Sequence, residues 1–266
     1  MNTKRWAWAG ALCGVLLGAV WCAPASLAAS ALSSATKGHL QLSDVRGSVW
    51  SGSALLVFAG GEGSRDAMTL PSRLHWQTGW SGRSLRLSAS QDCCINNKLE
   101  LNITPGWREV SVTVLDVGQE AGQTAGDWQL RWPAALLAGL GTPWNTLELS
   151  GQMRLRTQSL TLHWGREGWN QQGMAQADLL DISSRVSTIA PLGSYRLSMI
   201  GASEGGTLQL LTLSGALRLE GSGQISAKTT NFRGSATAEP GREAALDNLL
   251  NIIGQRQGAR SVISLG

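Results

Sequence analysis

The sequence is poor in the residues from which metal and catalytic sites are most often built. Its 266 residues include three histidines and four cysteines, and only 15% are charged. The histidines stand far apart, at His39, His75 and His163, and no HxH, HExxH or Cys/His spacing occurs. Because a metal ion needs several such ligands in one place, we predict no metal site and assign no cofactor-binding residue.

Motifs for nucleophilic or phosphate chemistry are also missing. No G-x-S-x-G motif stands between a strand and a helix, as a hydrolase elbow requires. The glycine-rich stretch 60–64 lacks the following lysine and helix of a phosphate-binding loop, so we interpret it as a hairpin loop. We therefore predict that the protein is not an enzyme, and assign no catalytic residue.

The charge is not arranged for binding nucleic acid. The formal net charge is +4, but Lys4 and Arg5 precede an apolar N-terminal run, and without them 20 basic residues face 18 acidic ones. The remaining arginines are spread singly along the chain, whereas a phosphate-binding surface gathers them on one face. No nucleic-acid partner is expected.

The cysteines raise the question of whether two adjacent thiols are oxidised. Cys13 and Cys22 lie in the apolar N-terminal run, which leaves the adjacent pair Cys93 and Cys94. Neighbours on a strand point to opposite faces, so two unpaired thiols are the first interpretation. The alternative is a vicinal disulfide, which an oxidising compartment would permit. The sequence does not say whether Cys93 and Cys94 are oxidised.

The N-terminus has the features of a membrane anchor. After Lys4 and Arg5, residues 6–36 carry no charge, and the most apolar part covers residues 6–21. At 1.5 Å per residue that part spans about 24 Å, and residues 22–29 extend it to the length of a bilayer core. The preceding positive charges predict a cytoplasmic N-terminus with the bulk of the chain exported.

A cleaved signal peptide is the alternative interpretation of the same segment. Small residues at Ser26 and Ala28, or at Ala23 and Ala25, fit a cleavage site. Under the anchor interpretation, residues 1–29 form a cytoplasmic stub and transmembrane helix. Residues 30–44 are then a linker, and residues 45–266 form an exported β-domain.

From Leu40 onward the dominant hydrophobic period is two, which is typical of half-buried strands. Gly, Asn and Ser separate the alternating segments, as in an antiparallel sheet with one apolar and one polar face. The clearest segments are 85–89, 99–103, 110–114, 195–199 and 216–219.

Glycine interrupts several predicted strands at similar places. The stretch 45–54 is predicted as the first strand, broken by Gly47 and Gly52. The pattern LxLSGxxRL occurs at both 147–155 and 211–219, which suggests a duplicated meander. The period of two predicts a mainly β fold. Because glycine in a strand marks a bulge or a bend, we expect its sheet to be curved. Its form is a curved antiparallel meander, either an open groove or a partial barrel.

Two segments have helical patterns. Residues 132–141, with a proline near the start and glycine at the end, predict a short mid-chain helix. Residues 242–255 carry a broad apolar stripe at helical spacing. We interpret that stripe as the face of a C-terminal helix that covers the open apolar side of the sheet. Docking of a partner is the alternative.

Tryptophan is the main aromatic residue, with 12 Trp against 2 Phe and 1 Tyr. Most of these tryptophans fall at predicted strand ends and turns. We expect them to pack at the ends of the sheet. The alternative is that the tryptophans form a platform on which a ligand stacks. Their wide distribution along the sequence does not favour a single site of this kind.

Several of these landmarks occur together in one known family. They are the anchor-like N-terminus, the stretch 45–54, Leu74-His75-Trp76, residues 133–146, residues 211–215 and the end 249–256. In this order they resemble type II secretion system protein N of Gram-negative bacteria.

The resemblance implies a single-pass inner-membrane protein with a periplasmic β-domain. It would be an accessory in exporting folded proteins across the outer membrane, with other type II secretion components as partners. The family has no assigned catalytic residues, so none is transferred. It is also similar to AsmA-like proteins with apolar grooves, which makes periplasmic lipid binding or transfer the alternative function.

Overall fold

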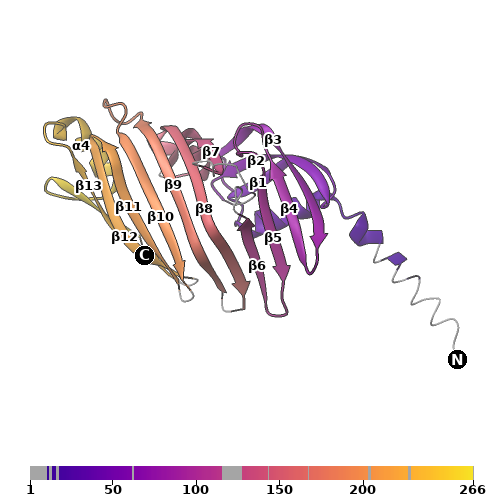
Figure 1. The fold of residues 1–266 in the computed structure, drawn as a ribbon. Coiled ribbons are helices and arrows are strands. Elements are labelled where there is room, and N and C mark those ends of the chain that lie inside the picture. The colour runs from indigo at the N-terminus through magenta and orange to yellow at the C-terminus, as the bar shows by residue number, and fades with distance from the viewer. Residues whose placement is uncertain are drawn as a thin grey trace.

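The protein is built around a single antiparallel β-sheet. The structure, a computed structural model, describes residues 11, 14–15, 18–61, 63–115, 128–142, 144–166, 168–202, 205–226 and 229–265. In that part of the chain, 15 strands join in the order β1-β2-β3-β4-β5-β6-β8-β9-β10-β11-β12-β13-β15-β14, and β7 pairs with β8 beside this path. Spatial order thus follows chain order almost throughout, as the gradual colour change across the sheet shows (Figure 1).

The strands vary from three to seventeen residues, and β8 and β9 are the longest. Their bounds are β1 (Leu40–Gly47), β2 (Ser51–Ala59), β3 (Ala67–Ser81), β4 (Ser84–Ser90), β5 (Leu99–Pro105), β6 (Glu109–Leu115), β7 (Leu130–Pro133), β8 (Leu149–Gly165), β9 (Gly168–Ser184), β10 (Gly193–Ala202), β11 (Gly205–Gly215), β12 (Leu217–Ile225), β13 (Thr230–Ala238), β14 (Gln255–Gln257) and β15 (Arg260–Leu265).

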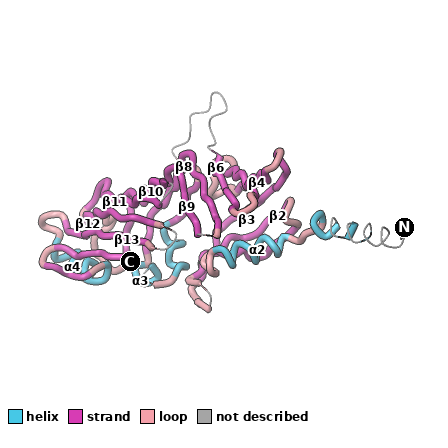
Figure 2. The backbone as a smooth tube through the Cα atoms, turned by 90° about the horizontal axis from the view of Figure 1, so that it is seen from below, coloured by secondary structure: helices cyan, strands magenta, loops and turns pink. Residues whose placement is uncertain are grey.

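Four helices lie on one side of the curved sheet in the part of the chain described from Ala25 onward (Figure 2). They are α2 (Ala25–Ala35), the 3₁₀ helix η1 (Ala134–Leu140), α3 (Trp144–Leu147) and α4 (Glu243–Ile253). We call the side of the sheet that they occupy the inner face. Apolar side chains of alternate strand residues point to it, and polar ones point to the outer face, as the period of two predicts. On the outer face Arg196 of β10 and Asp178 of β9 form an ion pair at 2.7 Å.

The two ends of the sheet differ. The turns after β1, β3, β5, β8, β10 and β12 are short and lie at one end, which we call the hairpin end (lower edge in Figure 1). The longer connections, with η1, α3 and α4, lie at the opposite end, which we call the loop end. The buried core is concentrated near the loop end, where Leu246 and Leu250 of α4 pack with Ile182 and Tyr195.

The prediction of a curved antiparallel meander is confirmed, and of its two forms the open one is found. Among the described residues, β1 and β14 stand at opposite ends of the strand order and do not pair with each other. Register shifts between Ser43 and Arg46 and between Ser150 and Gln152 mark bulges that bend the strands.

The predicted first strand is wrong in detail. The stretch 45–54 is not one strand: it contains the end of β1, the turn at 48–50 and the start of β2, and Gly47 pairs with Gly52 across the turn. Gly47 has φ +90°, a conformation that glycine adopts without steric cost, and this reverses the chain. The sheet begins at Leu40, and α2 occupies residues 25–35, so the segment 30–44 that was predicted as a linker contains the end of a helix and half of β1.

The predicted anchor lies largely outside the described residues. Residues 1–10, 12–13 and 16–17 of the segment 1–29 are among those that the structure does not describe. In the described part of the chain, no helix has the length and apolar character needed to cross a bilayer. The remaining described residues of this segment lead into α2, which starts at Ala25.

The C-terminal helix is confirmed, and the mid-chain helix is confirmed with a change. Leu246, Leu249 and Leu250 of α4 are buried against the inner face, which is the covering role that the apolar stripe predicts. Ser261 of β15 donates a buried hydrogen bond to the carbonyl of Leu250 at 2.5 Å and ties the helix to the sheet. The segment 132–141 begins as strand β7 and continues as η1, a 3₁₀ helix.

The interpretation of Cys93 and Cys94 as two free thiols is wrong. They form a vicinal disulfide with an S–S distance of 2.04 Å. The pair lies in the turn between β4 and β5 rather than on a strand, so its side chains do not point to opposite faces. Cys94 is buried beside Phe58 and Leu136, and the hydroxyl of Ser72 donates to the sulfur of Cys93 at 2.9 Å.

Candidate binding surfaces

The inner face carries a band of apolar side chains that continues from strand to strand. Near β4, β5 and β6, Leu87 lies opposite Leu101, and Leu101 lies opposite Val114. Each is half-buried rather than buried. Among the residues that the structure describes, no helix covers these three strands, since η1 packs on β2, β3 and β8. The band is therefore partly open at this part of the sheet.

The same band continues across the second half of the sheet. Leu197 of β10 lies opposite Ala177 of β9 on one side and opposite Leu210 of β11 on the other, and all three are half-buried. On β12 and β13 glycines replace large residues, and the ring of Phe232 lies over Gly221 and Gly234. The inner face is thus filled near the loop end by the α4 cluster and becomes more open toward the hairpin end.

A buried polar side chain interrupts the apolar band of the inner face. Gln171 of β9 is 1% exposed and lies against Gly201 and Gly206 of the next strands. Neither its amide nitrogen nor its amide oxygen has a hydrogen-bond partner among the described residues. A buried amide without partners costs about 1–3 kcal/mol, so this position is a natural contact point for a polar group of a ligand on the inner face.

The edge strands of the sheet, β1 and β14, differ in how well they are protected against pairing with another strand. On β1, the bulge at Asp44 holds Arg46 at 3.0 Å and Arg73 at 2.5 Å. Hydrogen bonds from Arg73 and Arg46 hold the pKa of the Asp44 carboxyl below its usual value, so this edge is charged. A charged bulge is a common defence against strand pairing. All three residues of β14 are exposed, and Arg256 is paired with Asp247 at 2.8 Å.

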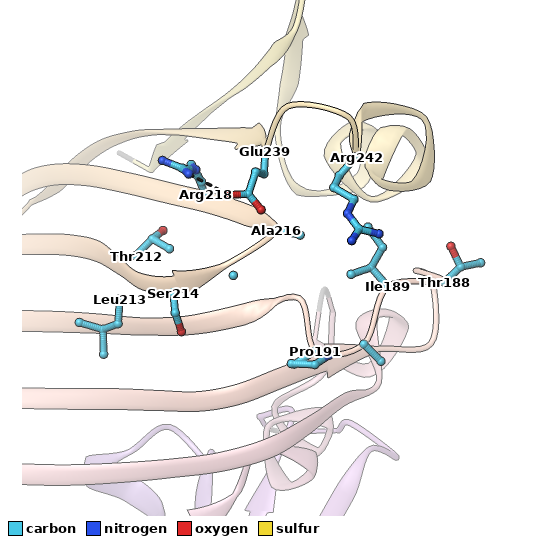
Figure 3. A pocket seen from close by; sticks show the side chains of 12 residues that line it. Thr188, Ile189, Pro191, Thr212, Leu213, Ser214, Ala216, Arg218, Glu239 and Arg242 are labelled. Atoms are coloured by element: carbon cyan, nitrogen blue, oxygen red, sulfur yellow. Dashed lines mark hydrogen bonds and ion pairs between the residues drawn. The ribbon is translucent and has the colours of Figure 1, made fainter.

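A polar pocket of about 710 Å³ lies at the loop end (Figure 3). The loop before β10, the β11–β12 turn and the start of α4 form it, and Arg218 in it pairs with Glu239 at 3.1 Å. Arg242 projects toward Ile189 from the other side (Figure 3). The lining includes no histidine, cysteine or lysine, so no nucleophile–base pair is formed there.

The structure also separates the residues considered for metal binding. His39 precedes β1, His75 lies on β3 and His163 lies on β8. The imidazole of His39 contacts the carbonyl of Ala59 at 3.2 Å, and that of His163 lies 3.8 Å from Glu109. Within the described ranges, no group of three His, Cys, Asp or Glu side chains is placed to hold a metal ion.

These features define an open β-sheet protein whose available surfaces are an apolar inner face, two strand edges and a polar pocket. Such surfaces suit binding. The chain belongs to the family described as type II secretion system (T2SS), protein N, which matches residues 38–263. The match begins two residues before β1 and ends within β15, so it covers the sheet except for the last two residues of β15. This confirms the resemblance seen in the sequence. No curated protein and no solved structure matches the chain.

The sequence missed the surfaces that the structure brings forward. The half-buried inner band depends on how strands pair, and the orphaned amide of Gln171 depends on which face of β9 it occupies. The β14 edge was not predicted because the helical segment was extended to Gln255, and the polar residues Gln255–Gln257 do not show the alternation of a half-buried strand. Gly254 in extended conformation, directly after α4, is the one local signal that could have located it.

Proposed function

We propose that this protein is an accessory component of the type II secretion system that supports export of folded proteins by binding other components of that system. The observation that carries the proposal is the family match over residues 38–263, which includes every strand of the sheet. In this proposal residues 1–29 anchor the chain in the inner membrane and the sheet lies in the periplasm.

The anchor would hold one end of the strand order near the membrane platform. Pro24 forms a bridge with Ser48, and the amide of Val49 donates to the carbonyl of Ala23 at 3.0 Å. The N-terminal segment is therefore fixed to the β1–β2 turn rather than joined by a slack linker. At about 4.8 Å per strand, the 14-strand path carries β14 about 60 Å along the sheet from this attachment.

The edge at β14 is the better place for another component to pair. An exposed strand edge is a template for adding a strand from a partner. Gln255–Gln257 is exposed at all three residues, whereas the β1 edge is interrupted by the charged bulge at Asp44. We therefore assign the β14 edge to partner binding and the β1 side to attachment.

Cross-linking in secreting cells tests this assignment. A photo-reactive amino acid at Gln257 should give cross-links to another secretion component, and one at the exposed outer-face residue Gln209 should give few or none. Deletion of the gene should lower the amount of folded protein released, and the intact chain should restore it. Normal export after deletion, with no cross-link from position 257, would count against the proposal.

Lipid binding is the second candidate function, and the inner face favours it. The half-buried apolar band from β4 to β11 is the kind of surface that acyl chains cover. The unpartnered amide of Gln171 would supply one polar contact within it. A groove that accepts lipid and an edge that accepts a protein do not exclude each other, because they lie on different parts of the sheet.

A further inference from the structure

The hairpin end carries three tryptophans with exposed side chains. Trp80 is 67% exposed, Trp107 is 102% exposed and Trp164 is 47% exposed. Trp107 stands at the tip of the β5–β6 turn, and the others end β3 and β8. An exposed large apolar group marks an interaction site more often when several lie together than when one stands alone.

The sheet places these three rings in one row. Strands β3, β4, β5, β6 and β8 are consecutive neighbours in the sheet. Their pairing is level at this end, because Ser81 pairs with Ser84 and Gly165 pairs with Glu109. The row from Trp80 to Trp164 therefore crosses four strand spacings, or about 19 Å.

Each of these tryptophans has an arginine within three residues of it. Arg83, Arg108 and Arg166 lie in the three turns that carry Trp80, Trp107 and Trp164. Glu109 follows Arg108, and the sequence places Glu167 after Arg166, so the net charge of the row stays small. The indole rings therefore determine the character of this row more than its net charge does. Each arginine side chain can donate hydrogen bonds to a phosphate group.

The row is continuous with the place where the apolar N-terminal segment leaves the sheet. The indole N–H of Trp50 donates to the carbonyl of Val20 at 2.9 Å, and its ring lies 6.3 Å from that of Trp80. Trp21, next to Val20, is 81% exposed. The hairpin end and the exposed apolar segment therefore face the same surroundings.

We propose that the hairpin end rests on a phospholipid bilayer, with Trp80, Trp107 and Trp164 in the interfacial layer and the neighbouring arginines at lipid phosphates. This rests on the proposed membrane attachment and adds a second contact to it. Tryptophan prefers the membrane–water interface because its ring is apolar and its N–H needs a polar partner. Contact at two places would fix the angle of the sheet to the membrane, which a single attachment at the N-terminal segment does not do.

Fluorescence quenching by brominated lipid tests this contact in the full chain. The protein is placed in nanodiscs of phosphatidylethanolamine and phosphatidylglycerol, with or without lipid brominated near the headgroup. The emission lost to bromine should fall when Trp80, Trp107 and Trp164 are all replaced by alanine. It should stay unchanged in Trp144→Ala, a matched control, because Trp144 is 37% exposed at the opposite end.

The single variant Trp107→Ala guards against misfolding, since this side chain packs on nothing, and it should lose part of the same quenching. Trp6, Trp8 and Trp21 serve as the reference for the N-terminal segment. Suppose that Trp6, Trp8 and Trp21 remain quenched, and that the emission lost in the triple variant is emission that brominated lipid does not quench. The proposed bilayer contact of the hairpin end is then wrong. That result would also be expected if the row binds a protein. If no tryptophan is quenched, the proposed membrane attachment fails as well.

Discussion

Tyr195, the only tyrosine of the chain, shows how single residues close the core at the loop end. Its phenol is 4% exposed, and its O–H donates to the carbonyl of Leu217 at 3.0 Å. Burial raises the pKa of the Tyr195 phenol well above its ordinary value, because the ionised form would lose its hydration. The neutral phenol is therefore part of the folded state.

This gives a prediction for alkaline pH. Because the pKa of Tyr195 is raised in the folded state, its stabilising effect is complete below about pH 10 and is lost as pH rises above that value. We expect the urea midpoint of the unaltered protein to fall more steeply above pH 10 than that of Tyr195→Phe. At pH 7 the variant should lose about 1 kcal/mol for the missing hydrogen bond. Parallel pH profiles would show that the phenol does not contribute.

The disulfide gives a second prediction at this scale. Trypsin should release a peptide of residues 87–98 that contains both Cys93 and Cys94. In the unreduced, denatured protein, iodoacetamide should leave this peptide unmodified, and after reduction it should add two groups. The mass of the peptide measures this directly. Two groups added before reduction would show that the thiols are free.

At the scale of elements, α4 decides whether the inner face is closed near the loop end. Leu249 is 2% exposed within the cluster that joins α4 to the sheet, while its neighbour Asn248 is exposed. Leu249→Asp would place a charge among apolar side chains. We expect it to lower the free energy of unfolding by about 3 kcal/mol or more, whereas Asn248→Asp should change it little.

Denaturant unfolding of the two variants measures the difference. A Leu249→Asp protein that unfolds at the same denaturant concentration as the unaltered chain, but no longer forms its complex, would contradict the covering role. It would instead support the alternative that α4 docks a partner.

The elements were predictable where a local pattern determines them. Strict alternation located β4, β5 and β6, and the apolar stripe located α4, because each pattern is set by which face is buried. The β1–β2 turn was missed because Val49 and Trp50 are typical strand residues. The turn depends on the backbone of Gly47 and on the Ser48 hydroxyl, which accepts hydrogen bonds from the amides of Trp50 and Ser51. For Cys93 and Cys94 the alternative interpretation, a vicinal disulfide, is the correct one, because a turn and not a strand holds the pair.

The candidate surfaces were less predictable because they depend on distant pairing. Gly215, at φ +124°, is an example: a Cβ there would overlap the Cα of Gly193, which is 22 residues earlier in the chain. The sequence marked Gly215 as a place where the sheet bends, but not the strand that approaches it. The row of exposed tryptophans has the same cause, since only the register brings three turns level.

At the scale of the whole molecule, the inner face makes a prediction about bound lipid. Leu208 and Gln209 are neighbours on β11 that point to opposite faces, the first half-buried on the inner face and the second exposed on the outer face. If the inner face holds lipid, Leu208→Glu should lower the phospholipid that co-purifies with the protein several-fold. Gln209→Glu should not, although it adds the same charge.

Lipid extraction and mass spectrometry measure the amounts, and circular dichroism checks that both variants keep their sheet. Equal lipid in the two variants would mean that the inner face is not the binding surface. If the unaltered chain retained more lipid than either variant, lipid binding would depend on the sheet as a whole.

The strand order of the sheet has a consequence for how the chain folds from its N-terminal end. Each strand from β2 to β6 and from β8 to β13 pairs with a neighbour that precedes it in the chain, so its partner is already available when that strand is delivered. Such a chain can assemble progressively from its first hairpin and needs few distant encounters. Only β14 and β15 follow the helix α4 in the chain, so the apolar side of the sheet near the loop end stays uncovered until almost the whole chain is available. A chain that stops before α4 would be prone to aggregate.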